Sequence, residues 1–266
     1  MPDLPTILQL LLVALAAVLV MGGAALSASG VRRGAVMLPA GGLVLALVAQ
    51  ALHSAGRGDW LPLQDNFDAL LWLAILVGGA ALYLRWRGTV PKIDLVSGPI
   101  VVLLLTGAAV FGRARPHEYT DSLWAWTHRL STYASPVAFA LAACAGVFYL
   151  VLRRKLRQKP HGPPDAGYGS LERLERLNYT AVQIGFALLT VGLVTGLVRA
   201  LGHSTKMGDH WFWQPKVLLS FGAYAVYAIV LNSPITPALR GRKTAILSIA
   251  GFVLLLGTLA AVQQMK

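Results

Sequence analysis

Histidine and tryptophan are the residues of this chain best suited to chemistry. Five of its six histidines and five of its seven tryptophans lie at or near the ends of apolar segments: His53, His117, His128, His203, His210, Trp60, Trp124, Trp126, Trp211 and Trp213. Imidazole is a common ligand of haem iron, and indole rings offer a porphyrin a broad, rigid apolar surface. The sequence shows no nucleophile or acid–base dyad, so we predict no catalytic side chain. The single cysteine, Cys144, lies inside an apolar run, which leaves no CxxC motif.

The elements that must position these side chains are membrane helices. The chain is 56% hydrophobic and 13% charged, whereas a soluble domain has roughly 25% charged residues. Because a backbone in lipid must satisfy its own hydrogen bonds, apolar runs of about 20 residues predict helices. We predict an all-α, polytopic membrane helix bundle, a single integral membrane domain over 1–266, with eight spans at about 5–27, 35–55, 66–86, 94–112, 122–152, 177–201, 212–232 and 244–264. No basic segment precedes the first run, which is expected to be a span and not a cleaved signal.

The basic residues predict the orientation of the spans. One set of alternate loops holds 15 of the 23 lysines and arginines, and the other side, which includes both termini, holds 8. Basic loops stay in the cytoplasm, so we predict extracytoplasmic termini in a bacterial inner (plasma) membrane. The net charge of +12 is therefore assigned to topology, with no nucleic-acid partner. The basic loop 153–176 is then cytoplasmic, and the Trp-rich loop 202–216 lies outside with all the histidines except His161.

The simplest alternative explanation is structural. Any single tryptophan could belong to the aromatic belt of a membrane protein, and any single histidine could be a satisfied polar residue at a helix end. His128, Thr132 and Ser135 fall on one face of the fifth span and form a polar stripe. Gly192 and Gly196 form a small-xxx-small face that another helix can approach closely, and we assign this face to helix packing.

The most specific segment is Met207-Gly208-Asp209-His210-Trp211-Phe212-Trp213-Gln214-Pro215-Lys216. It resembles the signature W-G-x-x-W-x-W-D-P-K-E of the cytochrome c assembly family, the CcsA- and CcmC-type haem-handling membrane proteins. Gly208, Trp211, Trp213, Pro215 and Lys216 match without a gap. The resemblance extends over about residues 45–260: His53 and His128 stand where the family has histidines, and 171–196 is similar to its cytoplasmic loop and sixth span.

The chain also departs from the family pattern. Met207, Gln214 and Val217 replace the signature's Trp, Asp and Glu, and Asn232 replaces a histidine of the haem-lyase branch. No histidine follows His210, although that branch has one before its last span. The chain therefore resembles a short, divergent member near the YpjD- and HemX-like relatives.

The resemblance implies non-covalent b-type haem, held or only passed on at the outer membrane face for attachment to apocytochrome c. His53 and His128 would be the metal ligands, in one site or in two, with His210 nearby and Trp211 and Trp213 along the porphyrin. Arg129, Arg199 and Lys216 would pair with the propionates. The implied partners are apocytochrome c, other cytochrome c assembly membrane subunits and the lipid bilayer, and the implied activity is that of a haem-lyase (holocytochrome c synthase) component. The alternative is a non-enzymatic scaffold or regulator of tetrapyrrole or cytochrome assembly with an eroded haem site; a solute transporter has little support.

Overall fold

The computed structural model describes residues 4–31, 33–63, 65–111, 122–158, 170–202 and 213–264. Within these ranges the chain is helical and has no strand. The helices are α1 (Leu4–Ser29), α2 (Gly34–Arg57), α3 (Asn66–Trp86), α4 (Asp94–Phe111), α5 (Leu123–Gln158), α6 (Leu171–Gly202), α8 (Pro215–Leu231), the 3-10 helix η2 (Pro237–Leu239) and α9 (Arg242–Gln264). Each of these α-helices overlaps one of the eight predicted spans, so the predicted all-α bundle is confirmed.

The described helices have the length and composition of membrane spans. Six of them, α1, α2, α3, α5, α6 and α9, are long and apolar enough to cross a bilayer, and α4 and α8 are shorter apolar helices. The chain is therefore a polytopic membrane protein.

The helices on either side of the predicted loop 153–176 extend into it. Helix α5 continues to Gln158, and α6 already begins at Leu171. The reason is composition: the flanks of this loop are rich in Arg, Lys, Leu, Gln and Glu, which are strong helix formers and extend a helix beyond the apolar span. Residues 159–169, which separate the two helices, lie outside the described part of the chain.

The chain divides into two compact units, Met1–Glu118 and Tyr119–Lys266. The single membrane domain over 1–266 stays a prediction.

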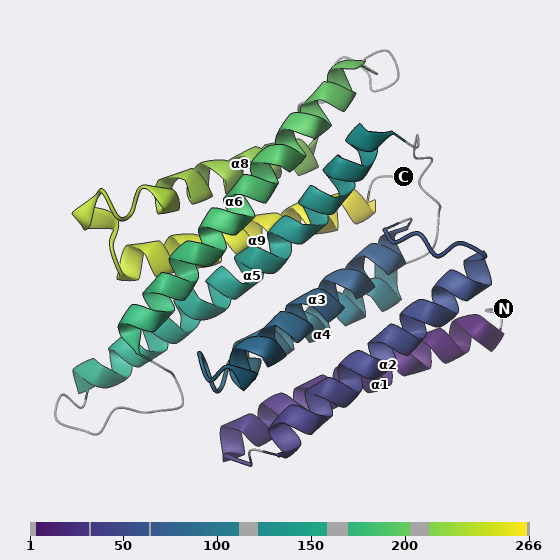
Figure 1. Cartoon of the computed structure of the whole chain (residues 1–266), viewed down its shortest axis with the longest axis horizontal. Coiled ribbons are helices and arrows are strands. Elements are labelled where there is room, and N and C mark those ends of the chain that lie inside the picture. Colours follow the sequence, from purple (N-terminus) through teal and green to yellow (C-terminus); the bar gives the residue numbers. More distant parts are fainter. Residues whose placement is uncertain are drawn as a thin grey trace. The chain divides into compact units, whose positions relative to one another are not determined.

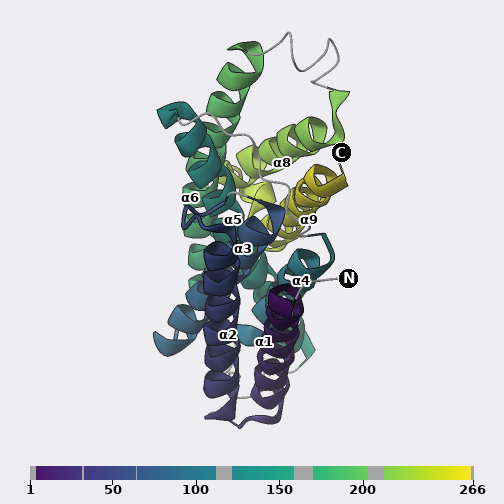
Figure 2. The same cartoon turned by 90° about the vertical axis from the view of Figure 1, so that its right-hand side faces the viewer.

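The first unit contains α1 to α4. Helix α1 lies along α2 and α4, and α3 packs against α2 and α4 (Figures 1 and 2). Small residues permit the close approach: a Cβ atom on Gly42 of α2 would lie 2.8 Å from the carbonyl oxygen of Ala16 in α1. Small residues at helix contacts are typical of packing in lipid, where van der Waals contact replaces the hydrophobic effect.

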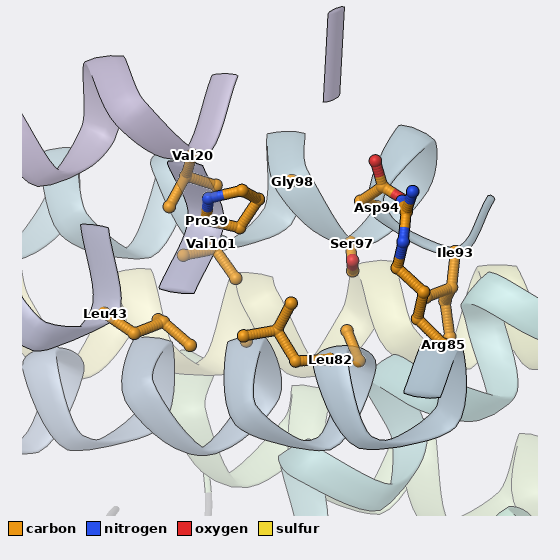
Figure 3. Close-up of a pocket in the computed structure, with 12 residues that line it drawn as sticks. Val20, Pro39, Leu43, Leu82, Arg85, Ile93, Asp94, Ser97, Gly98 and Val101 are labelled. Carbon is orange, nitrogen blue, oxygen red and sulfur yellow. The ribbon is translucent and has the colours of Figure 1, made fainter. Parts of the chain in front are cut away.

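A buried ion pair joins three helices of this unit. Arg85 of α3 donates to the carboxylate of Asp94 in α4, and it also donates to Ser27 Oγ of α1 at 3.0 Å. The two charged side chains are only 11% and 7% exposed. They lie at one end of a cavity of about 20 Å³, whose other end is lined by Val20, Pro39 and Leu43 (Figure 3). That volume holds about one water molecule and no larger ligand. We therefore assign the ion pair of Arg85 and Asp94 a structural role, which is to hold the helices together.

The second unit contains α5, α6, α8 and α9. Helix α5 runs along α6 and α9, and α8 packs against α9 and α6 (Figure 1). In its core the ring of Phe139 in α5 stacks on that of Tyr227 in α8, with centroids 3.6 Å apart. Asn178 of α6 donates to the carbonyl of Ala142 at 2.7 Å and accepts from Ser248 Oγ of α9 at 3.1 Å. These contacts hold α5, α6, α8 and α9 together.

The contact between α5 and α9 predicts a sensitive position. A Cβ atom on Gly146 would lie 2.9 Å from the backbone carbonyl oxygen of Ala245, and a backbone atom cannot rotate away. Gly146→Ala should therefore destabilise the protein by about 1–3 kcal/mol, the usual cost of overpacking. Thermal unfolding in detergent measures this. The matched control is Gly222→Ala, whose Cβ would meet its nearest atom at 3.9 Å; equal stability of the two variants would contradict the packing described.

Candidate functional site

The imidazole of His128 is held in one orientation by a neighbouring helix. His128 lies in α5, half-buried, and its Nδ1 is 2.8 Å from the carbonyl oxygen of Gly192 in α6. A carbonyl only accepts, so Nδ1 carries the proton in this bond and Nε2 is the basic nitrogen of the neutral ring. Thr195 Oγ1 lies 3.4 Å from the same Nδ1. This is the tautomer in which Nε2 is the atom that can ligate a metal.

Two glycines of α6 make room for this ring. A Cβ atom on Gly196 would lie 2.8 Å from His128 Cε1, and one on Gly192 would lie 3.0 Å from Thr132 Oγ1. The predicted small-xxx-small face is confirmed, and the helix that approaches it is α5. The close approach allows an imidazole of α5 to reach the backbone of α6.

A cavity of about 250 Å³ lies beside His128, inside the second unit. Its lining is partly apolar and partly hydroxylic and includes His128, Thr132, Gly196, Phe221 and Thr258. Gln214 and Lys216, from the Trp-rich segment, also line it. The structure thus brings together His128 of the fifth span and two residues of that segment, although about 90 residues separate them in the chain.

The other predicted residues of this unit are only partly described. Arg129 is 2% exposed, and its guanidinium lies over the ring of Trp126, 4.3 Å from the centroid. Trp213 is 67% exposed. His210 and Trp211 lie outside the described residues, and of Arg199 only the helical backbone is described.

His53 lies in the first unit, near the end of α2, where an acid holds it. Its Nε2 donates to Asp65 Oδ2 at 2.7 Å, and Arg57 Nη1 donates to the same oxygen at 2.9 Å. Burial alone would raise the pKa of the Asp65 carboxyl, but the hydrogen bonds from His53, from the Asp68 backbone and from Arg57 outweigh it and hold that pKa below its usual value. Phe67 packs on the imidazole, with ring centroids 4.6 Å apart. Asp65 is therefore an ionised partner of His53.

The cluster of polar side chains around Asp65 was not predicted from the sequence. It continues inward, where Gln50 donates to the carboxylate of Asp68 and Arg57 Nη2 lies 3.5 Å from Asp68 Oδ2. The signal was present: Gln50, His53 and Arg57 follow one another at helical spacing along one face of an otherwise apolar span. Polar groups on one face of a membrane helix need partners, and three aspartates, Asp59, Asp65 and Asp68, follow within 15 residues of His53.

Comparison with known proteins identifies the family of this chain. Residues 60–262 match the model of a family described as cytochrome C assembly protein. The chain belongs to this family. The match includes His128, Gly192, Gly196, Gln214 and Lys216, and it begins after His53.

Several relatives of this assembly-family protein carry the name cytochrome c biogenesis protein CcsA. The one from Guillardia theta is 25% identical over 219 residues, which cover 74% of this chain and 71% of the relative. The one from Gloeobacter violaceus is 27% identical over 76% of this chain and 54% of its own length. In the Prochlorococcus marinus (strain NATL2A) relative the match is 39% identical but covers only 34% of this chain and 27% of that protein. The chain thus spans only part of each of these relatives. No solved structure matches it.

The contact of the His128 imidazole with Gly192 and Gly196 predicts the effect of one added methyl group. Gly196→Ala should push the imidazole away from the Gly192 carbonyl, because the new Cβ would be 2.8 Å from Cε1. Nitrogen-15 NMR of histidine-labelled protein reports which ring nitrogen is protonated, and the His128 signals are assigned by their loss in His128→Ala. We expect protonated Nδ1 in the wild type and in Gly222→Ala, and a mixture of tautomers in Gly196→Ala. An unchanged spectrum of Gly196→Ala would contradict the described contact between the imidazole and α6.

Proposed function

We propose that this protein holds or passes on haem at the outer face of a bacterial plasma membrane, for attachment to apocytochrome c. Membership of the family supports the broader part of this proposal, which is a role in cytochrome c assembly. The observation that supports the haem site is the imidazole of His128, fixed by the Gly192 carbonyl at the wall of a cavity.

The residues around the cavity fit part of a haem. His128 offers Nε2 as an iron ligand, and the apolar and hydroxylic lining suits a porphyrin edge. Pockets that bury most of a drug-sized ligand have roughly 300–1,000 Å³, and this cavity has about 250 Å³. The described residues would therefore enclose only a part of the ring. Partial enclosure suits a haem that has to be handed on. Bound haem would supply the porphyrin to which the CxxCH thiols of an apocytochrome are joined.

Charge supports a defined orientation of the ligand. Lys216 lines the cavity, and an ammonium group at its wall can pair with a haem propionate. We assign the same role to Arg129 and Arg199, and we place Trp211 and Trp213 along the porphyrin with His210 as a nearby ligand. His53 is the second proposed source of an imidazole. Its Nε2 is hydrogen-bonded to Asp65.

The remaining parts of the proposal follow from the orientation and the family. With both termini and the Trp-rich segment on the extracytoplasmic side, haem and apocytochrome c would meet there, together with other assembly subunits. This would be the contribution of a haem-lyase component. The second candidate is a membrane scaffold or regulator with an eroded site. The observation that favours it is Gln214, an amide at the cavity wall where the family signature has an aspartate.

Haemin titration of the purified protein in detergent separates the two candidates. We expect a Soret band that saturates with the wild type and is lost or strongly weakened in His128→Ala, because the imidazole supplies the iron ligand. His161→Ala is the matched control, since His161 is the one histidine predicted on the cytoplasmic side. The absence of a saturable band in the wild type, or an equal band in His128→Ala, would favour the scaffold.

Lys216 predicts a selective effect on the propionates. Lys216→Met keeps the length and apolar stem of the side chain but removes its charge. A hydrogen bond to a charged group is worth about 1.5–3 kcal/mol, so haemin affinity should fall by about 10- to 100-fold. Haemin dimethyl ester, whose propionates are uncharged, should bind both proteins about equally. A parallel loss for haemin and ester would show that Lys216 acts on the cavity and not on the propionates.

A further inference from the structure

A hydroxyl group of α6 lies against the His128 imidazole, beside the two glycines. Thr195 follows Gly192 by three residues and directly precedes Gly196, so all three lie on the same side of the helix. Thr195 is only 3% exposed, and its Oγ1 lies 3.4 Å from His128 Nδ1. The face of α6 that meets the imidazole thus includes two glycines, which make room, and a hydroxyl, which can form a hydrogen bond.

The other contacts of Thr195 decide in which direction this hydrogen bond runs. Its Oγ1 donates to the carbonyl oxygen of Val191 at 2.7 Å and lies 3.1 Å from that of Gly192. A hydroxyl has one proton and two acceptor lone pairs, and a carbonyl can only accept. The proton of Thr195 therefore points toward the α6 backbone, and its lone pairs are left for an N–H group. Thr195 accepts from His128 Nδ1, as the Gly192 carbonyl does at 2.8 Å.

We infer that Thr195 is a positioning residue for His128, which holds the Nδ1–H of the ring together with the Gly192 carbonyl so that Nε2 is the nitrogen offered to haem iron. This inference rests on the proposed function, in which His128 supplies the ligand. A neutral imidazole has one N–H, and acceptors beside Nδ1 stabilise the tautomer that carries the proton there. A partner of this kind also orients a metal-binding imidazole and makes its ligating nitrogen more basic.

The position of the ring in the fold agrees with this role. His128 lines the cavity of about 250 Å³ in the second unit, and the hydrogen bonds from α6 reach its Nδ1. Nε2 is farther from Cβ than Nδ1, so it is the ring nitrogen that a flat porphyrin can approach. The tautomer that Thr195 favours is therefore the one that leaves the accessible nitrogen basic.

The hydroxyl can hold the imidazole because it is itself held. Threonine is β-branched, so its first side-chain torsion is restricted, and the 2.7 Å hydrogen bond to the Val191 carbonyl fixes it further. Acceptors at 2.8 Å and 3.4 Å from Nδ1 also limit rotation of the ring, because a turn of the imidazole moves Nδ1 away from both. With little water to compete, these hydrogen bonds are stronger than on an exposed surface.

Substitutions of two threonines in α6 separate positioning from packing. Thr195→Val keeps the β-branched shape and removes the hydroxyl, whereas Thr195→Ser keeps the hydroxyl and removes the methyl group. Thr190→Val is the matched control, because it makes the same change in the same helix. There Thr190 Oγ1 donates to the Phe186 carbonyl four residues earlier at 2.8 Å, as Thr195 Oγ1 does to the Val191 carbonyl.

The test uses the full-length protein in detergent and three readouts: nitrogen-15 NMR of the His128 ring without haem, haemin affinity and thermal unfolding. In Thr195→Val we expect more of the tautomer with the proton on Nε2 and a fall in haemin affinity of about 2- to 10-fold, the equivalent of one neutral hydrogen bond. Thr195→Ser should behave as the wild type, and Thr190→Val should change neither the tautomer nor the affinity. In a His128→Ala background, Thr195→Val should have no further effect on affinity.

Other outcomes overturn the inference in distinguishable ways. If His128→Ala weakens haemin binding but Thr195→Val changes only the unfolding temperature, Thr195 is a packing residue and the inference is wrong. It is also wrong if Thr195→Ser loses as much affinity as Thr195→Val, or if Thr195→Val lowers affinity equally with and without His128. If the wild type shows no saturable haemin binding, or His128→Ala binds haemin as the wild type does, the ligand role of His128 in the proposed function fails, and this inference fails with it.

Discussion

The hydrogen bond between the His128 imidazole and the Gly192 carbonyl depends on the absence of two side chains. Any residue larger than glycine at 192 or 196 would place a Cβ within 3.0 Å of an atom of α5. The glycines thus set the distance between α5 and α6, and that distance decides whether a side chain of α5 can use the backbone of α6 as an acceptor. In lipid, helix contacts come from close packing. The residues that set the distance between α5 and α6 therefore also decide which nitrogen of the His128 imidazole carries the proton.

Apolar length and helix-breaking residues predicted the fold well, because lipid leaves a spanning segment little choice but a helix. The predicted bounds of the third span, 66–86, are the observed bounds of α3, Asn66–Trp86. The ends of α5 and α6 were not, since beyond the bilayer edge helix propensity decides where a helix stops, and hydrophobicity carries no information about it. The basic residues of 153–158 were assigned to a loop on their charge, although most of them are good helix formers.

The site could be predicted only as residue types. His128, Thr132 and Lys216 were chosen from a polar stripe and a family signature, and the structure places all three around one cavity. The pairing of His53 with Asp65 is a contact between two helices across a loop, and no periodicity within one segment predicts it. Likewise, the role of Gly192 could not be predicted from side-chain types, because its backbone carbonyl makes the contact. That carbonyl decides which nitrogen of His128 is basic.

The two proposed ligands would differ in strength as a consequence of what holds them. A neutral carbonyl fixes the tautomer of His128 and adds little negative charge, whereas the ionised Asp65 fixes that of His53 and increases its donation to a metal. Arg57 moderates this by sharing the carboxylate oxygen at 2.9 Å. If both histidines ligate haem as proposed, the imidazole on Asp65 binds iron more strongly and the imidazole on the Gly192 carbonyl releases it more easily. A protein that passes haem on needs ligands of the second kind where the haem leaves. Under the proposed function, the cavity beside His128 would then be the place of transfer.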